Sequence, residues 1–345
     1  MRYKVTFIPG DGIGPEVMSV ARSVIEAAGV DVDWDIVMAG ERAYIETGSP
    51  LPEETIESIR ENKVALKGPL TTPIASGYSS VNVALRKIFD LYAIVRPVKS
   101  IPGLSCRYPN VDLILIREGT EGLYFGIEHS FGAGKEVAIA LRVVTRSTCR
   151  RLAHFAFEYA RKHRRRKVTL VHKANILKLT CGLMREEFFK VAENYPDLRA
   201  EEILVDNMAM QLVLNPEEYD VVLTSNMFGD ILSDLAAGLI GTIGVSPSAN
   251  IGDEYAIFEP THGTAPQLAG RNMANPVAAV LAGAMLLEHL GEAKAASIIR
   301  RAVEDVIKEG KYITFDIAKI CGVPPASTSQ MGRRLVERTQ ELMES

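Results

Sequence analysis

Short strand-like runs that alternate with longer helical patterns constrain the fold of this chain more than any other feature. Apolar runs typical of strands cover residues 4–8, 30–37, 64–66, 113–116, 168–171 and 221–224. Apolar residues at helical spacing fill residues 17–25, 85–91, 277–290 and 296–307. Strands that alternate with helices in this way predict an α/β protein with a largely parallel sheet.

Two stretches rich in Pro, Gly and Ser, Pro97–Pro102 and Ser246–Asp253, interrupt this pattern. A chain of 345 residues has room for two domains of roughly 150 residues each. We therefore expect residues 1–99 and 251–345 to form one large domain, with residues 100–250 inserted into it as a smaller one.

The composition excludes several classes of protein. Hydrophobic residues make up 47% of the chain, so disorder is excluded as the main state. The 39 basic and 43 acidic residues leave a net charge of -4, which argues against a nucleic-acid partner. The longest apolar run, residues 276–287, is shorter than the roughly 20 residues that span a membrane. The sequence opens without a secretory signal, so we expect a cytoplasmic protein with no membrane partner.

The four cysteines, Cys106, Cys149, Cys181 and Cys321, are scattered along the chain without a Cys-x-x-Cys pair. This usage favours reduced, packed thiols and argues against a zinc site. A disulfide such as Cys149–Cys181 is left open.

A glycine-rich loop, Pro9-Gly-Asp-Gly-Ile-Gly14, follows the first strand and opens a helix. Its glycines are spaced G-x-G-x-G, whereas a Rossmann dinucleotide loop needs G-x-G-x-x-G. We therefore interpret it as a tight turn that lets the backbone approach another segment closely.

Polar residues converge on the start of a predicted helix at Ser80, which is a good N-cap. Asn82 and Arg86 lie four apart and share one helix face. With the loop at residues 67–73 and with Arg96, they provide hydroxyl, amide and guanidinium groups suited to carboxylate or phosphate oxygens. The alternative is a capped surface helix with a solvated Arg86.

Two further strands end in groups capable of acid–base chemistry. Arg117 closes one strand, at the edge where open α/β sheets bind ligands, and Tyr124 follows it as a candidate proton donor. Lys173 follows another strand, and a partly buried lysine can act as a base. The alternatives are a half-buried core tyrosine and a surface lysine. His172 is expected to be structural, because its neighbours supply no metal-ligand spacing.

Paired carboxylates are the most informative cluster. Asp230 and Asp234 lie four apart on a predicted helix, where like charges repel unless a cation lies between them. The flanking Ile231 and Leu232 indicate a largely buried helix, which raises that cost. Oxygen ligands favour Mg²⁺ or Mn²⁺, and Asp206, at the end of another strand, is a third candidate ligand. A solvated acidic stripe is the alternative.

With these motifs, the chain resembles the metal-dependent β-decarboxylating dehydrogenases, which act on isocitrate, 3-isopropylmalate, homoisocitrate or tartrate. The resemblance runs from Pro9–Glu16 to about Asp316 and includes Asn226–Asp234, like the family's metal signature, and Glu259–Ala265 with Asn275-Pro276, like its cofactor loop. It implies a two-domain α/β/α sandwich without a Rossmann nucleotide site.

The resemblance also implies a role for each candidate site residue. The substrate would be bound by Thr72, Ser80, Asn82, Arg86, Arg96 and Arg117. Tyr124 and Lys173 would be the catalytic acid–base pair, and Asp206, Asp230 and Asp234 would hold Mg²⁺ or Mn²⁺. The cofactor would be bound by Glu259, His262, Gly263, Thr264, Ala265, Gln267, Asn275 and Asp316.

Family members are homodimers or larger assemblies with shared active sites. The resemblance therefore implies that the inserted domain carries metal ligands and a dimer interface, and that Lys173 and Asp206 serve the site of the partner subunit. In the reaction so implied, the metal lowers the pKa of the substrate hydroxyl, Lys173 takes its proton, and Tyr124 protonates carbon after CO₂ leaves.

The substrate and cofactor depend on a few positions. Ser80 and Asn82 match the isocitrate-type pattern, because a third carboxylate needs hydrogen-bond donors. Homoisocitrate, one methylene longer, and 3-isopropylmalate are the alternatives. Gln267 replaces the usual cofactor selector, and Phe315 lacks the hydroxyl of a phosphate-binding tyrosine, which favours NAD; NADP is left open because Lys319 could meet a phosphate. A non-catalytic regulatory subunit is a further alternative, which the retained Tyr124 and Lys173 disfavour.

Overall fold

The computed structural model describes residues 2–74 and 77–344. The chain divides into two compact units, each formed from more than one segment. Unit 1 contains Met1–Phe89, Ser100–Pro109 and Ala237–Ser345, and unit 2 contains Asp90–Lys99 and Asn110–Ala236.

The unit boundaries differ from those expected near residues 99 and 250. Strand β4 (Ala93–Lys99) pairs antiparallel with β5 (Asp112–Glu118) along its whole length and so lies in unit 2. Strand β11 (Pro247–Ile251) pairs antiparallel with β12 (Ala256–Pro260) and so lies in unit 1. Both boundaries differ from the expected ones because strand pairing decides which unit a strand joins, and local composition does not reveal that pairing.

Five strands of unit 1 are hydrogen-bonded in the order β2-β1-β3-β12-β11. Strand β1 (Tyr3–Ile8) pairs in parallel with β2 (Val32–Ile36) and with β3 (Val64–Lys67), and β3 pairs in parallel with β12. All four residues of β3 and all five of β12 are buried, as expected for strands covered on both faces.

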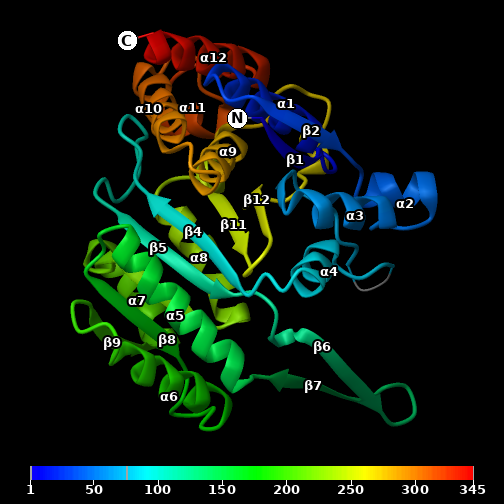
Figure 1. Cartoon of the computed structure of the whole chain (residues 1–345), viewed down its shortest axis with the longest axis vertical. Coiled ribbons are helices and arrows are strands. Elements are labelled where there is room, and N and C mark those ends of the chain that lie inside the picture. The colour runs from blue at the N-terminus through cyan, green and yellow to red at the C-terminus, as the bar shows by residue number, and fades with distance from the viewer. Residues whose placement is uncertain (1, 75–76, 345) are drawn as a thin grey trace. The chain divides into compact units, whose positions relative to one another are not determined.

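Unit 1 also contains most of the helices. Helix α9 (Val277–His289) is apolar on all sides and packs against α1 and α10, which in turn contact α12 (Figure 1). The bounds of the other helices are α1 Gly14–Ala27, α2 Glu41–Thr47, α3 Glu53–Asn62, α4 Val81–Ile88, α10 Ala293–Glu309, α11 Phe315–Cys321 and α12 Thr328–Glu344, with short 3-10 turns at η2 Ile243–Val245 and η3 Pro266–Leu268.

Unit 2 has its own strand order, β4-β5-β10-β8-β9. Strands β8 (Lys167–His172), β9 (Arg199–Leu204) and β10 (Val221–Thr224) are parallel to one another, and β10 is parallel to β5. The carboxyl ends of these strands therefore meet at one edge. The helices of this unit are α5 Arg146–Lys162, α6 Thr180–Ala192, α7 Val205–Leu214 and α8 Asn226–Leu239, whose last residues fall in unit 1, with a 3-10 turn at η1 Pro216–Glu218.

A separate two-stranded ribbon, β6 (Gly122–Phe131) and β7 (Val137–Val143), projects from unit 2 (Figure 1). The sequence patterns did not predict it. Several large apolar side chains on this ribbon are exposed, by 41% to 54%: Phe125, Phe131, Val137, Ile139 and Leu141. An exposed apolar patch of this kind is typical of a surface that binds another protein.

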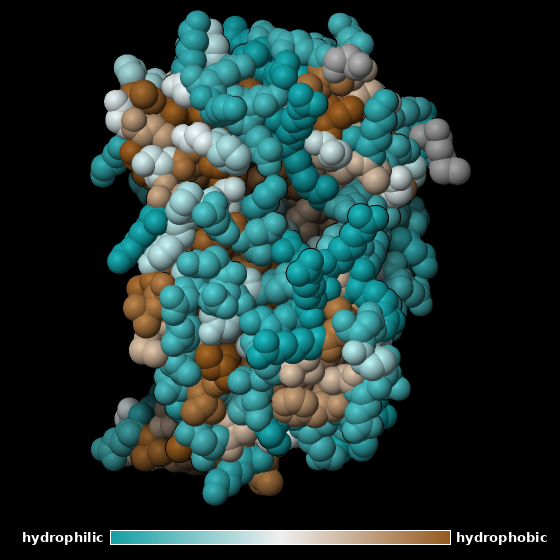
Figure 2. Space-filling view, turned by 90° about the vertical axis from the view of Figure 1, so that its left-hand side faces the viewer, coloured by the Kyte–Doolittle hydropathy of each residue, from teal (hydrophilic) through white to brown (hydrophobic). Residues whose placement is uncertain are grey.

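The α/β prediction is confirmed by the arrangement of strands and helices. Strand β10 begins and ends at the predicted residues, and α9 ends one residue before the predicted end. Hydrophilic residues dominate the face shown in Figure 2, with hydrophobic residues in scattered patches. Among the described residues, no helix is long and apolar enough to cross a membrane. All four cysteines are free thiols, and burial raises the pKa of Cys149 to about 12.

Candidate functional site

Helix α4 carries Asn82 and Arg86, with Ser80 as its N-cap residue, as predicted. The Ser80 hydroxyl oxygen accepts the N–H of Val83 at 3.4 Å, which confirms the N-cap. The side-chain oxygen of Asn82 is buried and has no hydrogen-bond partner among the described residues. A buried polar atom without a partner favours a polar ligand at this position.

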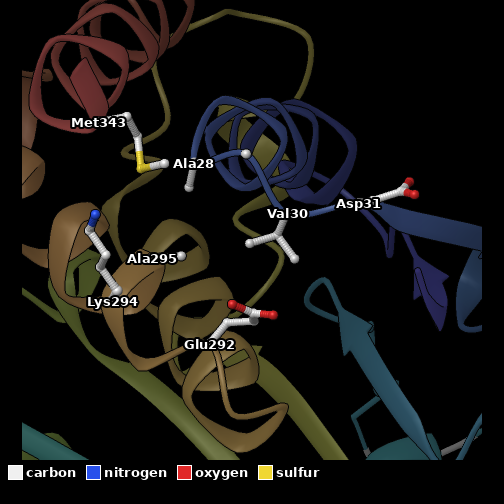
Figure 3. Close-up of a pocket in the computed structure, with 8 residues that line it drawn as sticks. Ala28, Val30, Asp31, Glu292, Lys294, Ala295 and Met343 are labelled. Carbon is white, nitrogen blue, oxygen red and sulfur yellow. The ribbon is translucent and has the colours of Figure 1, made fainter. Parts of the chain in front are cut away.

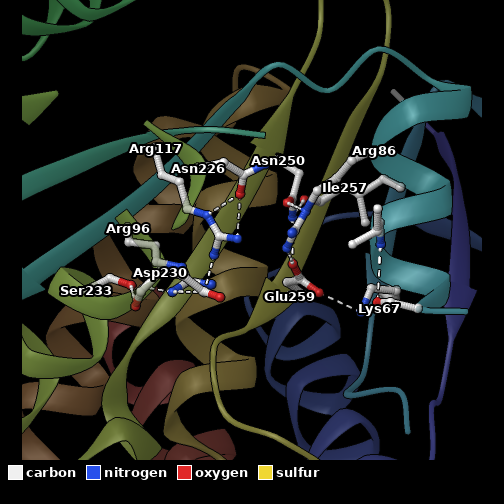
Figure 4. A network of polar contacts seen from close by, with 12 residues as sticks. Lys67, Arg86, Arg96, Arg117, Asn226, Asp230, Ser233, Asn250, Ile257 and Glu259 are labelled. Atoms are coloured by element: carbon white, nitrogen blue, oxygen red, sulfur yellow. Dashed lines mark hydrogen bonds and ion pairs between the residues drawn. The ribbon is translucent and has the colours of Figure 1, made fainter. Parts of the chain in front are cut away.

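Arg86 is buried at 7% exposure and belongs to a charged network within unit 1 (Figure 4). Its Nε donates to Oδ1 of Asn250 at 2.9 Å, and its Nη2 lies 3.5 Å from Oε1 of Glu259. Lys67 Nζ lies 2.5 Å from Oε2 of the same carboxylate, and Asn250 Nδ2 donates to Oε1 at 2.7 Å. The guanidinium of Arg86 is therefore fixed in place by groups behind it.

Glu259 is the anion of this network and lies between its two cations. Burial by itself raises the pKa of Glu259, but the charges of Lys67 and Arg86 and the hydrogen bonds from Lys67 and Asn250 lower it to about 2. The carboxylate is therefore ionised at neutral pH and lowers the cost of burying both cations. The prediction that Glu259 contacts a cofactor stays a prediction; its observed contacts are with Lys67, Arg86 and Asn250.

Sequence reasoning included Lys67 only as the start of the 67–73 loop and assigned no role to Asn250, because the network depends on strand register. Asn250 of β11 lies opposite Ile257 of β12, so Glu259 is its diagonal neighbour on the same face. Lys67 ends β3, the other neighbour of β12. No local spacing brings these positions together. The only signal in the sequence was a lysine at the end of a buried strand.

A second network lies in unit 2 and gathers five of the predicted residues, of which Arg96, Arg117 and Asp230 are labelled in Figure 4. Arg117, at 1% exposure, donates from Nε to Oδ1 of Asn226 at 3.0 Å and forms an ion pair through Nη1 with Asp230. The Tyr124 hydroxyl donates to the other oxygen of Asp230 at 2.6 Å, and the Arg117 guanidinium lies 5.3 Å from the centre of the Tyr124 ring. The predicted arginine, tyrosine and aspartate are thus brought together.

Arg96 joins this unit 2 network and not the α4 cluster with which the sequence grouped it. Its Nη1 lies 3.6 Å from a carboxylate oxygen of Asp230 and 3.6 Å from one of Asp234, and it donates to the Ser233 hydroxyl. Pairing of β4 with β5 places Arg96 opposite Leu115, two residues before Arg117. The cationic side chains therefore come from neighbouring strands.

Glycine at position 229 allows the close approach of Arg117 to α8. A Cβ atom there would lie 2.7 Å from both Cβ and Cγ of Arg117, closer than real Cβ contacts. This explains the glycine in the Asn226-Met-Phe-Gly-Asp230 segment, which the sequence interpretation treated only as part of a metal signature.

Asp230 and Asp234 share one face of α8, as their spacing predicted. Burial raises the pKa of Asp234; Arg96 opposes this shift, and the charge of Asp230 adds to it. A divalent cation would relieve that repulsion, so this pair fits the predicted metal. Among residues 2–74 and 77–344, however, no three His, Cys, Asp or Glu side chains are grouped to hold a metal.

The predicted third ligand, Asp206, is paired with the predicted base. Lys173 Nζ lies 2.5 Å from Oδ1 of Asp206 within unit 2. The hydrogen bond from Lys173 lowers the pKa of the Asp206 carboxyl. Side-chain exposure is 26% for Lys173 and 64% for Asp206. One chain therefore presents these two residues as a pair, separate from any three-ligand metal group.

The predicted cofactor loop, residues 259–265, packs against the glycine-rich turn. The N–H of Ile13 donates to the carbonyl of Thr264 at 2.9 Å, and a Cβ at Gly12 would lie 2.1 Å from that oxygen. Gly12 has a φ of 58°, a conformation that glycine adopts readily. The interpretation of this turn as a site of close backbone approach is confirmed, and the segment it approaches is the predicted cofactor loop.

The His262 ring in this loop has one nitrogen, Nε2, without a hydrogen-bond partner among the described residues. Its Nδ1 lies 3.0 Å from the carbonyl oxygen of Gly263, which can only accept, so Nδ1 holds the proton. Nε2 is then an acceptor, and it is buried without a partner among the described residues. Burial lowers the pKa of His262, in keeping with a neutral ring. An acceptor of this kind fits an amino or hydroxyl group of a nucleotide cofactor.

Asn275 and Asp316, far apart in sequence, are in direct contact in unit 1. The Asn275 amide donates to Oδ2 of Asp316 at 2.9 Å, and Thr242 and Thr314 also donate to this carboxylate. Of the other predicted binding residues, Thr72 and Gln267 are exposed, and Ala265 adopts a left-handed φ of 37°. Their predicted roles stay predictions.

One pocket of unit 1, about 230 Å³ in volume, contains none of the predicted residues (Figure 3). Its charged side chains are Asp31, Glu292 and Lys294, and Met343 and Val30 contribute apolar surface. The Glu292 carboxylate accepts a hydrogen bond from the Tyr3 hydroxyl at 2.8 Å. Asp31 is paired with Arg2, which does not line the pocket, and no cluster of buried charges among the described residues lines it, so the chemistry points to the two charged networks instead.

The sequence pattern of the isocitrate/isopropylmalate dehydrogenase family matches residues 4–335. Two curated relatives are each 47% identical. One is a mitochondrial regulatory subunit of NAD isocitrate dehydrogenase from Dictyostelium discoideum, aligned over 91% of this chain and 87% of the relative. The other is 3-isopropylmalate dehydrogenase from Methanothermobacter thermautotrophicus, aligned over 89% of this chain and 91% of the relative.

A solved structure, isocitrate dehydrogenase from Methylococcus capsulatus, superimposes with a TM-score of 0.96 at 50% identity and covers 98% of this chain and 99% of that one. The fold and the sequence together define an oxidoreductase of the dehydrogenase class. The chain belongs to the isocitrate/isopropylmalate dehydrogenase family, as its motifs indicated. Enzymes of this family use a nicotinamide cofactor and a divalent metal ion.

Proposed function

We propose that this enzyme oxidises and decarboxylates isocitrate to 2-oxoglutarate and CO₂ and reduces NAD, with Mg²⁺ or Mn²⁺. Helix α4 and its N-cap residue carry the substrate assignment. There the Ser80 hydroxyl proton has no acceptor among the described residues, the Asn82 amide oxygen is buried without a partner, and Arg86 is held by Glu259. An isopropyl group would leave the Asn82 amide unpaired, at a cost of about 1–3 kcal/mol.

Each of these side chains has its own role in the proposed reaction. Arg86, Arg96 and Arg117 bind carboxylates of the substrate, which suits their buried and oriented guanidinium groups. Lys173 would accept the proton of the 2-hydroxyl group, and a bound nicotinamide would serve as the hydride acceptor. Tyr124 gives its hydroxyl proton to the carbon from which CO₂ has left.

The metal proposal rests on α8. Asp230 and Asp234 provide two carboxylates on one face; burial raises the pKa of Asp234 and the charge of Asp230 adds to that shift, so a bound cation would lower the cost of ionising both. Asp206 completes the ligand set from the partner subunit. When bound, the metal supplies Lewis-acid stabilisation of negative charge on the substrate.

We propose a homodimer or larger homo-oligomer with shared sites, and neither a nucleic acid nor a membrane as partner. The exposed apolar side chains of the β6–β7 ribbon support a protein partner. The pairing of Lys173 with Asp206, apart from any three-ligand group, supports sharing. A cytoplasmic location is proposed from the scattered cysteines.

NAD is proposed over NADP on the residues near the cofactor loop. Gln267 is an exposed, uncharged side chain in η3, and Phe315 at the start of α11 has no hydroxyl for a 2′-phosphate. Lys319 is the nearby cation in the sequence and is exposed. A comparison of kcat/KM for the two cofactors tests this choice, and a preference for NADP would overturn it.

The function is tested by steady-state kinetics with isocitrate, homoisocitrate and 3-isopropylmalate, each with NAD and with NADP, in the presence of Mg²⁺ or Mn²⁺. We expect isocitrate with NAD to give the highest kcat/KM, with 2-oxoglutarate and NADH formed in equal amounts. A preference for either other acid would replace the substrate assignment. No activity as a homo-oligomer, with activation of a partner chain, would identify a regulatory subunit.

A further inference from the structure

A buried histidine precedes Lys173 directly in the chain. His172 ends β8 and is 5% exposed. Its Nδ1 accepts the N–H of Ala174 at 3.0 Å, and its Nε2 lies 3.0 Å from Oε2 of Glu202. The sequence predicted only a structural role for this residue, yet both of its ring nitrogens are engaged next to the proposed base.

These two partners determine where the ring proton lies. A backbone N–H can only donate, so Nδ1 of His172 carries no proton. Nε2 therefore carries it and donates to the Glu202 carboxylate. Burial lowers the pKa of His172, which favours this neutral ring; Glu202 opposes that shift and Arg185 adds to it.

Glu202 is itself held by a bidentate contact from α6. Arg185 Nε lies 2.5 Å from Oε2 of Glu202, and Nη2 lies 2.7 Å from Oε1. The hydrogen bond from Arg185 lowers the pKa of Glu202, so this acceptor is ionised at neutral pH. The chain of contacts from Arg185 through Glu202 fixes the plane of the His172 ring.

The backbone of Lys173 is consequently held on both sides. Its carbonyl oxygen accepts the N–H groups of Ile176 at 3.1 Å and Leu177 at 2.8 Å, while the next amide, of Ala174, is bound by the His172 ring. These bonds set the direction in which the Lys173 side chain leaves the backbone toward Asp206.

We propose that His172 is a positioning residue for Lys173. Its neutral ring holds the N–H of Ala174 and so fixes the backbone that presents the ammonium group. This inference rests on the proposed role of Lys173 as the base of the reaction. A base misplaced by about 1 Å can cost 100-fold in rate without loss of substrate binding.

Two amide substitutions separate the functions of the two ring nitrogens. In His172→Asn the side-chain oxygen takes the place of Nδ1 and still accepts from Ala174. In His172→Gln the side-chain amide reaches the position of Nε2 and can still donate a hydrogen bond to Glu202. The N–H of Ala174 then loses its acceptor. We expect kcat within about threefold of the parent for Asn and a loss of roughly 10–100-fold for Gln, with KM for isocitrate changed less than about twofold in both.

His154→Gln is the matched control, because His154 lies on α5 and contacts Tyr195 instead. It should leave kcat unchanged. Equal kcat for the two His172 variants, or a higher value for Gln, would overturn the inference. Lys173→Ala separates failure of the proposed base from failure of the positioning role. If that variant stays active, the proposed base is wrong and the inference falls with it; if it is inactive while His172→Gln is active, only the inference fails.

A measurement on the unmodified enzyme covers the case in which His172→Gln does not fold. Nitrogen-15 NMR of the histidine rings reports which ring nitrogen carries the proton, and the signal lost in His172→Asn identifies His172. We expect a ring protonated at Nε2 alone at neutral pH. A proton on Nδ1, in either the neutral or the charged ring, would overturn the inference, because Nδ1 could then not accept from Ala174.

Discussion

At the scale of single residues, Glu259 lowers the free-energy cost of burying two cations, Lys67 and Arg86. Each cation is at most 7% exposed, and a buried charge without a partner costs several kcal/mol. The carboxylate of Glu259, also buried, is in contact with both. It therefore contributes to stability and, under the proposed function, orients Arg86 for the substrate.

Replacement of Glu259 by Gln should lower the free energy of unfolding by about 3–5 kcal/mol at pH 7, because two buried cations then lack their anion. The pKa of Glu259 is lowered from 4.5 to about 2 in the folded protein. A lowered pKa contributes stability above the unfolded value, and this contribution is lost as the pH falls toward 2. The difference between parent and variant in urea unfolding should therefore shrink between pH 5 and pH 2.

Glu254→Gln is the matched control for this prediction. Glu254 pairs with Lys63, but both side chains are more than half exposed, at 66% and 54%. Exposed ion pairs contribute little, so no measurable change is expected. Equal effects of the two substitutions would show that burial of Glu259 between cations is not what stabilises the fold.

Tyr124→Phe removes one hydroxyl proton from the unit 2 network. We expect kcat to fall by about 10²- to 10⁴-fold, the usual range for a general acid, with a small change in KM. Steady-state assays with isocitrate measure this, and Tyr159→Phe on α5 serves as a control that leaves kcat unchanged. A fall of kcat below threefold in Tyr124→Phe would exclude Tyr124 as the proton donor.

At the scale of elements, α8 combines a packing requirement with a binding one. Gly229 lets the helix approach Arg117, and the next turn presents Asp230 and Asp234 on one face. Under the proposed function, the same helix orients a guanidinium for the substrate and carboxylates for the metal.

Asp230→Asn should raise the apparent dissociation constant for Mg²⁺ at least about tenfold, because one of two charged oxygen ligands on α8 becomes neutral. Activity measured against metal concentration gives this constant. Asp305→Asn, on α10 and in contact with Arg338, is the control. An unchanged metal dependence in Asp230→Asn would remove α8 from the metal site.

Local patterns predicted the elements that depend on local interactions. Ser80 was identified as an N-cap because capping involves residues three apart, and the Asp230–Asp234 pair because helix spacing is fixed. The contacts of Glu259 with Asn250 and Lys67 depend on the register of separate strands, which no local spacing encodes. The β6–β7 ribbon was missed because its apolar residues are exposed instead of packed in a core.

At the scale of the whole molecule, shared active sites make activity depend on assembly. If Lys173 serves the site of the partner subunit, Lys173→Ala and Tyr124→Phe homomers are each inactive. In a mixed dimer, one site carries both defects and the other carries neither. Mixing and reassociation of the two variants should therefore restore about one quarter of the parental activity, as random pairing in a two-fold dimer requires. No recovery from a reassociated mixture would place both residues in the same site.

The substrate assignment is the central claim, and it depends on the polar first turn of α4. The most direct test is the ratio of kcat/KM for isocitrate to that for 3-isopropylmalate, measured with NAD and Mg²⁺. A site built to hydrogen-bond a polar group rejects an apolar analogue strongly, so we expect a ratio above about 10³. A ratio below one would contradict the account and assign Ser80 and Asn82 to a different substrate.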